Sequence, residues 1–310
     1  MILPSQVSIQ KIRHYVGHVA GIFCIEQGLS ANTVLSGGGD GVVAEWDLNS
    51  DENGKGIVKV PGNIFSLLLM ADKNLLIAGD LHGGVHTNDL AGKQEIGIIG
   101  YPGGAIYDIK RLNQNHIVIG AGNGNAYIRN VDTNEAVTEI EVSDKSIRAI
   151  TISQKRNELI FACSDFNLYV YDATSYILKH VLSSHNNSVF SSAFNSEETQ
   201  LVSGSRDAQL KIWDVNQDYK LLQSIPAHMY TVNHVVLSPD GQFFATGGRD
   251  KHIKIWDASN FNLLKVIDLE KYGGHSNSVN KLFWSKWNNF LISCGDDRIV
   301  MVWEVKNGAI

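Results

Sequence analysis

Three segments in the C-terminal half of this chain share one pattern: LVSGSRDAQLKIWD at 201–214, FFATGGRDKHIKIWD at 243–257 and LISCGDDRIVMVWE at 291–304. Each begins with an apolar run, passes through a Gly- or Asp-rich turn and ends in Trp followed by an acidic residue. A fourth copy, TVLSGGGDGVVAEWD, occupies 33–47. Apolar alternation on both sides of turn-forming residues predicts two β-strands joined by a tight turn.

The pattern recurs at a nearly constant interval along the whole chain. Starting from Trp46, steps of 42, 42, 41, 42, 43 and 47 residues reach Asn88, Asn130, Tyr171, Trp213, Trp256 and Trp303. A period of about 40–45 residues with four short strands in each unit is typical of propeller blades. The sequence therefore predicts an all-β, seven-bladed β-propeller of four-stranded antiparallel blades, forming a single domain over 1–310.

The N-terminal strand is expected to close the ring. The predicted blades, from inner to outer strand, are 18–60, 63–100, 104–142, 145–182, 185–225, 228–269 and 275–304, the last completed by 6–13. After Trp303 only EVKNGAI remains, too little for an outer strand, whereas VSIQKIRHY before Gly17 has no partner. Pairing this strand beside the one that ends at Trp303 would cover the exposed edge of the last blade.

Composition and charge fit a globular chain and limit the choice of partners. Lys and Arg total 26 against 32 for Asp and Glu, a net charge of -6, which disfavours nucleic acid and anionic membranes. No apolar run approaches the ~18 residues of a membrane-spanning helix, so we expect a cytoplasmic protein. Cys24, Cys163 and Cys294 lie far apart in apolar strand patterns, which predicts buried thiols without a metal or redox role.

The repeats resemble the WD-repeat family over essentially the whole chain. The residues that carry the resemblance are Gly17-His18 with Trp46-Asp47, Ser184-His185 with Trp213-Asp214, Ala227-His228 with Trp256-Asp257, and Gly274-His275 with Trp303-Glu304. It implies that a His, a strand Ser or Thr, a turn Asp and the Trp form a buried hydrogen-bonded relay in each of these blades. The relay residues would be His18, Ser36, Asp40 and Trp46; His185, Ser203, Asp207 and Trp213; His228, Thr246, Asp250 and Trp256; and His275, Ser293, Asp297 and Trp303.

The second, third and fourth units depart from the family pattern. They place Asn88, Asn130 and Tyr171 at the Trp position, and only the fourth keeps the turn Asp, at Asp165. Strand spacing and apolar alternation persist in all three units. We therefore count them as blades that lack the relay, with local stability in doubt.

Sequence features that suggest catalysis have simpler explanations. A His, Ser and Asp triad would occur once, whereas this set recurs in four units and no G-x-S-x-G motif accompanies it. GAGNGN at 120–125 lies between two strands and opens no helix, so it is a turn rather than a phosphate-binding loop. His82 and His86 lie on a turn and its exit rather than on one helical face. We expect no catalytic residue, metal or cofactor.

The resemblance places partner contacts at the rim of the central channel, on the face that carries the His loops and the turn Asp. The position five residues after the His gives Phe23, Phe65, Tyr107, Arg148, Phe190, Asn233 and Asn280. The position before the turn Asp includes Arg206 and Arg249, in adjacent blades, which could jointly hold a carboxylate or phosphate. Aromatic and Arg side chains are enriched at interface hot spots.

The leading hypothesis is a non-catalytic scaffold that binds a protein or peptide at the rim, as a monomer or a subunit of a larger complex. Two alternatives stay open: the aromatic side chains plug the channel, or the channel holds a small molecule or metal in an enzyme or sensor. The seven positions five residues after the His contain no carboxylate or His, which favours the scaffold. Phe65, Tyr107 and Arg148 lie on the arc without relays, so we expect the partner there first.

Overall fold

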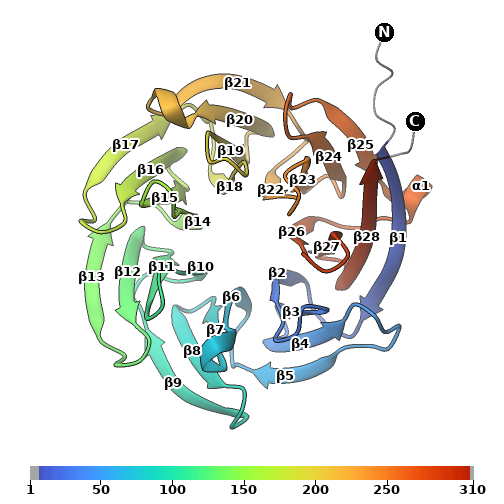
Figure 1. Cartoon of the computed structure of the whole chain (residues 1–310). Coiled ribbons are helices and arrows are strands. Elements are labelled where there is room, and N and C mark those ends of the chain that lie inside the picture. The colour runs from blue at the N-terminus through green and yellow to red at the C-terminus, as the bar shows by residue number, and fades with distance from the viewer. Residues whose placement is uncertain (1–6, 308–310) are drawn as a thin grey trace.

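The computed structural model describes residues 7–307 as seven β-sheets around a central channel (Figure 1). Every sheet has four antiparallel strands, which confirms the predicted all-β, seven-bladed propeller. Residues 1–6 and 308–310 of the predicted domain, including Gln6 of the predicted closing strand, lie outside the described residues.

The strands follow the predicted repeat. From inner to outer strand, blades 1 to 4 are β2 Ile22–Gln27, β3 Thr33–Gly38, β4 Val42–Asp47, β5 Lys55–Lys59; β6 Ile64–Met70, β7 Leu75–Asp80, β8 Gly84–Asp89, β9 Gln94–Gly100; β10 Ile106–Arg111, β11 His116–Ala121, β12 Asn125–Asn130, β13 Ala136–Glu141; β14 Ile147–Ser153, β15 Glu158–Cys163, β16 Asn167–Asp172, β17 Leu178–Ser183. Blades 5 to 7 are β18 Val189–Phe194, β19 Gln200–Ser205, β20 Gln209–Asp214, β21 Lys220–Pro226; β22 Val232–Leu237, β23 Phe243–Gly248, β24 Ile253–Asp257, β25 Leu263–Ile267; β26 Val279–Trp284, β27 Phe290–Gly295, β28 Ile299–Asn307, β1 Val7–Val16.

Short helical turns occupy some of the connections. Two 3-10 turns, η1 Ala71–Lys73 and η2 Val215–Gln217, lie in blades 2 and 5. The helix α1, Leu269–Tyr272, lies between blades 6 and 7 and accounts for the longest interval of the repeat. Asp268 begins it by accepting a hydrogen bond from the Lys271 N–H at 2.7 Å. No helix among residues 7–307 has the length and apolar character needed to cross a bilayer.

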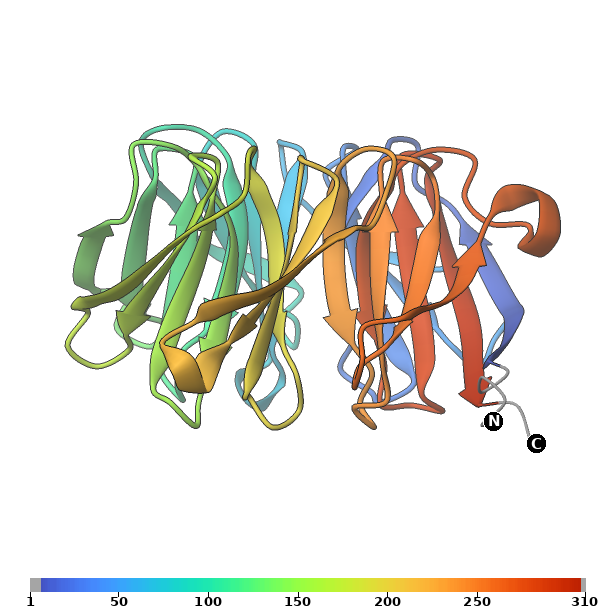
Figure 2. The same ribbon diagram turned by 90° about the horizontal axis from the view of Figure 1, so that it is seen from above.

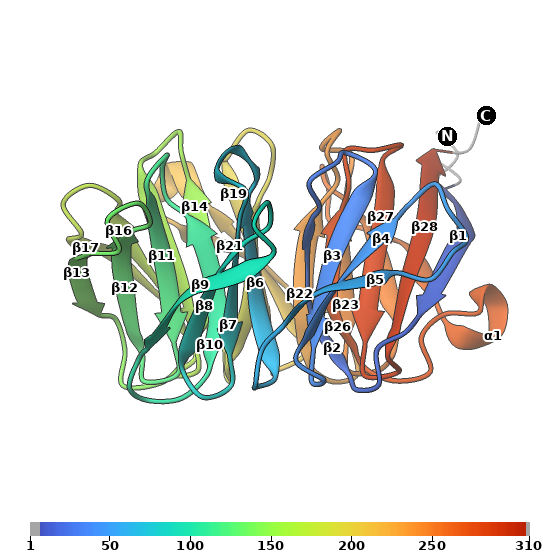
Figure 3. The same ribbon diagram turned by 90° about the horizontal axis from the view of Figure 1, so that it is seen from below.

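The ring closes through β1, as predicted. This strand pairs antiparallel with β28 at the outer edge of blade 7, from Val7 opposite Asn307 to Val16 opposite Ile299 (Figure 1). The closing strand extends beyond the predicted 6–13, to Val16. The last blade extends beyond the predicted 275–304, because β28 continues to Asn307 and pairs there with β1. Since β1 begins where β28 ends, both described chain ends lie on one face (Figures 2 and 3).

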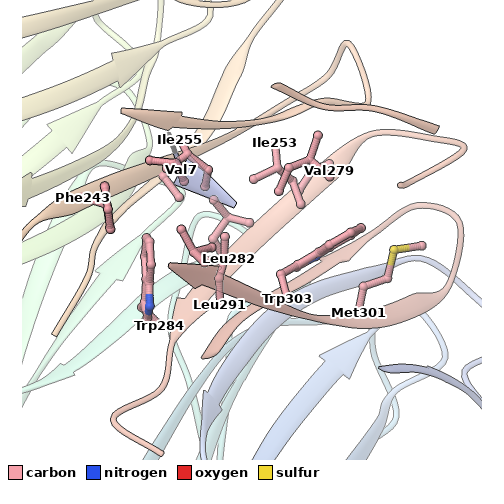
Figure 4. Close-up of a cluster of buried hydrophobic side chains, with 13 residues drawn as sticks. Val7, Phe243, Ile253, Ile255, Val279, Leu282, Trp284, Leu291, Met301 and Trp303 are labelled. Atoms are coloured by element: carbon pink, nitrogen blue, oxygen red, sulfur yellow. The ribbon is translucent and has the colours of Figure 1, made fainter. Parts of the chain in front are cut away.

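The hydrophobic core lies between neighbouring blades rather than within any one of them. Figure 4 shows one such layer, in which Phe243 and Ile255 of blade 6 pack near Leu291 and Trp303 of blade 7. Val7 of β1 belongs to the same buried cluster. Because each blade buries its faces against its neighbours, the ring must be complete for any blade to be covered on both sides.

Candidate partner-binding face

The structure brings all sixteen predicted relay residues together, in blades 1, 5, 6 and 7. In blade 6, Thr246 Oγ1 lies 2.8 Å from His228 Nε2 and accepts a hydrogen bond from Trp256 Nε1 at 3.0 Å. His228 Nδ1 lies 2.8 Å from an Asp250 carboxylate oxygen. The corresponding contacts span 2.7 to 2.9 Å in His18, Ser36, Asp40 and Trp46; His185, Ser203, Asp207 and Trp213; and His275, Ser293, Asp297 and Trp303.

The relay fixes the protonation of its histidines. An ionised carboxylate only accepts hydrogen bonds, so Nδ1 of His228 carries the proton that it donates to Asp250. In the neutral ring Nε2 then accepts from the Thr246 hydroxyl, which itself accepts from the Trp256 N–H. Every polar atom of this buried chain is thereby satisfied.

Acid should destabilise the relay in two pH ranges. Burial lowers the pKa of His185 and His228, although their aspartates oppose this shift. Burial by itself raises the pKa of Asp207 and Asp250, but the hydrogen bonds from histidine and backbone N–H groups outweigh it and lower the pKa to about 2. Both groups therefore bind protons more readily in the unfolded chain, so their stabilisation is lost as pH falls.

We expect the free energy of unfolding in urea, at constant ionic strength, to fall below the ordinary histidine pKa of about 6.5 and again below about pH 4. Replacing both Asp207 and Asp250 by Asn should remove part of the second decrease without removing the first. An unchanged slope below pH 4 in the double variant would contradict this assignment.

The relay also determines which side chain the adjoining loop displays. The N–H of Met229, the residue after His228, donates to Asp250 Oδ2 at 3.0 Å. The residue after the His makes the same contact in the other relay blades, through Val19, Asn186 and Ser276. Met229 is 77% exposed and Val19 is 74% exposed. A buried structural element thus holds exposed apolar side chains in fixed positions on the rim face.

Blade 2 has a polar cluster of its own. Its Asp80 and His86 each lie two residues before the positions that the turn Asp and the Trp would occupy in the repeat. The buried His86 lies with Nε2 3.1 Å from Asp80 Oδ2 and Nδ1 2.7 Å from Glu95 Oε1. Asp80 also accepts from the N–H groups of His82 and Gly84. Both ring nitrogens of His86 are engaged while His82 is exposed. Within residues 7–307, no three His, Cys, Asp or Glu side chains are grouped so that they could hold a metal ion.

Blades 3 and 4 have other side-chain contacts in place of the relay. Tyr101, in the connection from β9 to β10, packs against Tyr127 of blade 3 with ring centroids 4.4 Å apart. In blade 4, Asp165 accepts hydrogen bonds from Ser143 at 2.8 Å and from the Tyr169 hydroxyl at 2.5 Å. The blades without the family relay therefore have other side-chain contacts, and their lower local stability stays a prediction.

The three cysteines are free and buried, as predicted. Burial raises the pKa of the Cys24 thiol to about 12, and also raises the pKa of Cys163 and Cys294. Thiols that stay protonated and covered are poor nucleophiles and poor metal ligands.

The seven predicted rim residues occupy one equivalent position around the channel. Each is the second residue of an inner strand, and the pairing with the next strand shifts at that residue in every blade. A bulge of this kind re-aims the extra side chain. All seven side chains are half-buried. We name them the channel ring: Phe23, Phe65, Tyr107, Arg148, Phe190, Asn233 and Asn280.

Five members of the channel ring contact one another in a row from blade 1 to blade 5. Phe23 stacks on Phe65 with centroids 4.8 Å apart, and Phe65 meets Tyr107 edge-on at 5.6 Å. The Arg148 guanidinium lies 3.9 Å from the Tyr107 centroid and 4.4 Å from that of Phe190. The aromatic side chains therefore bury part of their area on each other, as a channel plug would, and leave only part for a partner.

The two asparagines complete the channel ring with polar contacts. Asn233 Nδ2 donates to Ser278 Oγ at 2.9 Å, which joins blade 6 to blade 7. Asn280 Nδ2 donates to the Ile22 carbonyl at 3.0 Å and to Asp296 at 2.7 Å, which joins blade 7 to blade 1. Both amide groups therefore form hydrogen bonds that join neighbouring blades.

Arg148 is a half-buried cation that forms no ion pair with a carboxylate among residues 7–307. The ion-paired arginines of the described chain are Arg13, Arg111 and Arg156. Burial lowers the pKa of Arg148, Tyr107 opposes this shift, and the positive charge of Arg206 adds to it. The exposed Arg206 and Arg249 likewise have no carboxylate within ion-pairing distance among residues 7–307.

Two strongly exposed apolar side chains of the rim face lie in a loop that is hydrogen-bonded to the segments carrying these two arginines. Met229 is 77% exposed and Tyr230 is 59% exposed, in the loop that leads from blade 5 into blade 6. We name Arg206, Met229, Tyr230 and Arg249 the blade 5–6 patch. Sequence reasoning missed Met229 and Tyr230, because it considered other positions of the repeat.

Backbone hydrogen bonds join the three loops of the blade 5–6 patch. Ala227 N–H donates to the Ala208 carbonyl at 2.9 Å, in the turn that carries Arg206. Arg249 N–H donates to the Thr231 carbonyl at 3.0 Å. The patch is thus a single surface of fixed geometry.

Charged groups do line the channel, at positions deeper than the channel ring. A cavity of about 550 Å³ is lined by Asp108, Lys110, His234 and Lys281, among others. Asp108 accepts from the Ile150 N–H at 2.8 Å, across the blade 3–4 boundary, and pairs with Lys110 at 3.4 Å. The carboxylate is therefore already engaged in joining two blades.

Comparison with known proteins agrees with this architecture. The family model described as "WD domain, G-beta repeat" matches residues 177–214, 219–257 and 267–304. Protein tipD of Dictyostelium discoideum is 25% identical over 98% of this chain and 49% of its own length. Protein HIRA of the same organism is 33% identical over 41% of this chain and 13% of its own length. This chain thus spans about half of tipD and a small part of HIRA.

Among solved structures, the WD40 beta propeller domain of Doa1 superposes with a TM-score of 0.83 at 19% identity. The superposition covers 96% of this chain and 97% of that domain. At this level of identity the likeness concerns the fold.

Proposed function

Since this chain carries WD40 repeats in a seven-bladed propeller, we propose that it is a non-catalytic scaffold that binds a protein or peptide through its rim face. The blade 5–6 patch is the main support, because Met229 and Tyr230 expose apolar area that the fold itself does not use. Apolar and aromatic side chains flanked by arginines have the composition of an interface hot spot.

The channel ring has a second role in this proposal. Its aromatic side chains provide a partly covered apolar surface at the channel mouth: Phe23, Phe65, Tyr107 and Phe190. Positive charge comes from Arg148, Arg206 and Arg249. Asn233 and Asn280 belong to the proposed surface through their half-buried side chains, while their amide N–H groups donate within the propeller. The proposed centre of binding therefore shifts from the arc of blades 2 to 4 toward blades 4 to 6.

Replacing Met229 and Tyr230 together by Ser should reduce partner capture at least tenfold, which corresponds to a loss of about 1.4 kcal/mol in binding. The melting temperature should stay within a few degrees, because exposed side chains contribute little to folding. The measurement is quantitative mass spectrometry of proteins retained by the immobilised chain from extract of its source cells, with a thermal melt of each variant.

The matched control is Ile96→Ser with Ile98→Ser. These side chains are 53% and 56% exposed on β9, the outer strand of blade 2, away from the rim face. Capture should be unaffected by this pair. If the control pair abolishes capture and the rim pair does not, the partner binds a blade edge and the proposal is wrong.

A further inference from the structure

Arg148 occupies a position that is prepared for an anion. Its guanidinium lies between the rings of Tyr107 and Phe190, at 3.9 and 4.4 Å from their centroids. Aromatic rings at these two distances enclose the guanidinium group and restrict the directions in which its N–H groups can form hydrogen bonds. A guanidinium edge matches the two oxygens of a carboxylate.

The fold supplies no anion for this edge. Among residues 7–307, no carboxylate ion-pairs with Arg148, and the like charge of Arg206 lowers the pKa of its guanidinium. Two cations near each other at the mouth of a partly desolvated channel repel one another. Binding an anion there removes this repulsion, so the site gains affinity from charges that the folded chain leaves uncompensated.

Position relates this site to the blade 5–6 patch. Arg148 lies on β14, the inner strand of blade 4, and its neighbour Phe190 lies on β18, the inner strand of blade 5. Arg206 lies on the turn of blade 5 that is hydrogen-bonded to the loop of Met229. The Arg148 site and the blade 5–6 patch therefore lie on blades 4, 5 and 6, which follow one another around the ring.

We propose that the Arg148 guanidinium, held between Tyr107 and Phe190, binds the carboxylate of an Asp or Glu side chain in an acidic segment of the protein partner. This deepens the proposed function and rests on it. A carboxylate fits better than a phosphate group, because apolar rings wall the site and a dianion is harder to desolvate than a monoanion. The net charge of -6 adds to the disadvantage of a dianion.

The test uses three blocked peptides: Ac-Gly-Leu-Glu-Leu-Gly-NH2 and its Gln and phosphoserine analogues. The readout is the Nε–Hε NMR signal of Arg148, identified by its loss in Arg148→Lys. The Glu peptide should shift this signal saturably and bind at least tenfold more tightly than the Gln peptide. Absence of any shift with Glu, or a shift with phosphoserine alone, overturns the proposal.

Variants separate this inference from the proposed function. Arg148→Lys keeps the charge but loses the planar edge, so it should abolish discrimination between Glu and Gln. Binding to this variant is measured by calorimetric titration, because its Arg148 signal is absent. Arg206→Gln, at an exposed position that should not affect folding, should weaken the Glu peptide several-fold. Arg298→Gln removes the same charge from the rim turn of blade 7 and should change nothing. If the Met229 and Tyr230 pair abolishes partner capture while Arg148→Lys leaves it intact, the scaffold function stands and the carboxylate site is wrong.

Discussion

Deleting the chain up to Val16 should abolish cooperative unfolding of the whole propeller, because β1 is the outer strand of blade 7 and also a link to blade 1. Tyr15 is 1% exposed, and its hydroxyl donates to the carbonyls of Asp47 and Ser50 at 2.7 and 3.0 Å. Losing one buried aromatic costs about 3–5 kcal/mol, and the deletion also unpairs the whole edge of β28. Together these losses are comparable with the total stability of about 5–15 kcal/mol of a typical domain.

A rearranged chain provides the control for the deletion. In a permutant that begins at Gly17 and carries 7–16 after β28 on a short linker, β1 keeps its partner, because Val7 already lies opposite Asn307. This permutant should melt within a few degrees of the parent, as followed by circular dichroism and calorimetry. A deletion variant that melts cooperatively near the parent temperature would show that β1 does not close the ring.

Most of this architecture could be predicted from the repeat, whereas the parts of the fold that do not repeat could not. Strand spacing follows from apolar alternation and turn residues, which recur with the blade. The length of the β1–β28 pairing does not follow from the repeat. It depends on a contact between the two ends of the chain, through which β28 continues to Asn307. The short helix α1 could not be predicted either, because it occurs once and the repeat has a period of about 42 residues.

The candidate site was predictable where it follows the repeat. The sixteen relay residues and the channel ring occupy equivalent positions in successive blades, so their numbers alone place them. Contacts among members of the ring depend on geometry, and the stacking of Phe23 on Phe65 is an example. Met229 and Tyr230 did leave a signal, since two large apolar residues in a loop are unusual unless something covers them. The cluster of His86 and Asp80 left no signal in the sequence, because neither residue lies at a position that repeats in the other blades.

The second large effect concerns Glu158, which is completely buried at the start of β15. It accepts from the Tyr219 hydroxyl at 2.6 Å and from Arg156 Nε at 3.2 Å, and it forms an ion pair with Lys179. Tyr219 comes from blade 5, so the carboxylate joins two blades that lie beneath the proposed binding face. Burial by itself raises the pKa of Glu158, but these partners, above all Lys179, outweigh it and lower the pKa.

Removing the two cations should therefore destabilise the protein more than removing the carboxylate. Arg156 and Lys179 are 33% and 36% exposed, so Glu158→Gln leaves them able to hydrate and should cost about 1–2 kcal/mol. Arg156→Ala with Lys179→Ala leaves a charge of zero exposure without compensation and should cost about 3–5 kcal/mol at pH 7.

The pH dependence distinguishes these two variants. Without its cations Glu158 acquires a raised pKa in the folded state, so the stability deficit of the double variant should shrink as pH falls through that pKa. The parent behaves oppositely, because a lowered pKa means that the contribution of Glu158 is lost on acidification. Urea unfolding at pH 7 and pH 5 checks both the order and the sign. Equal losses in the two variants at pH 7 would mean that water reaches Glu158 and that its burial does not govern the energetics of the blade 4–5 boundary.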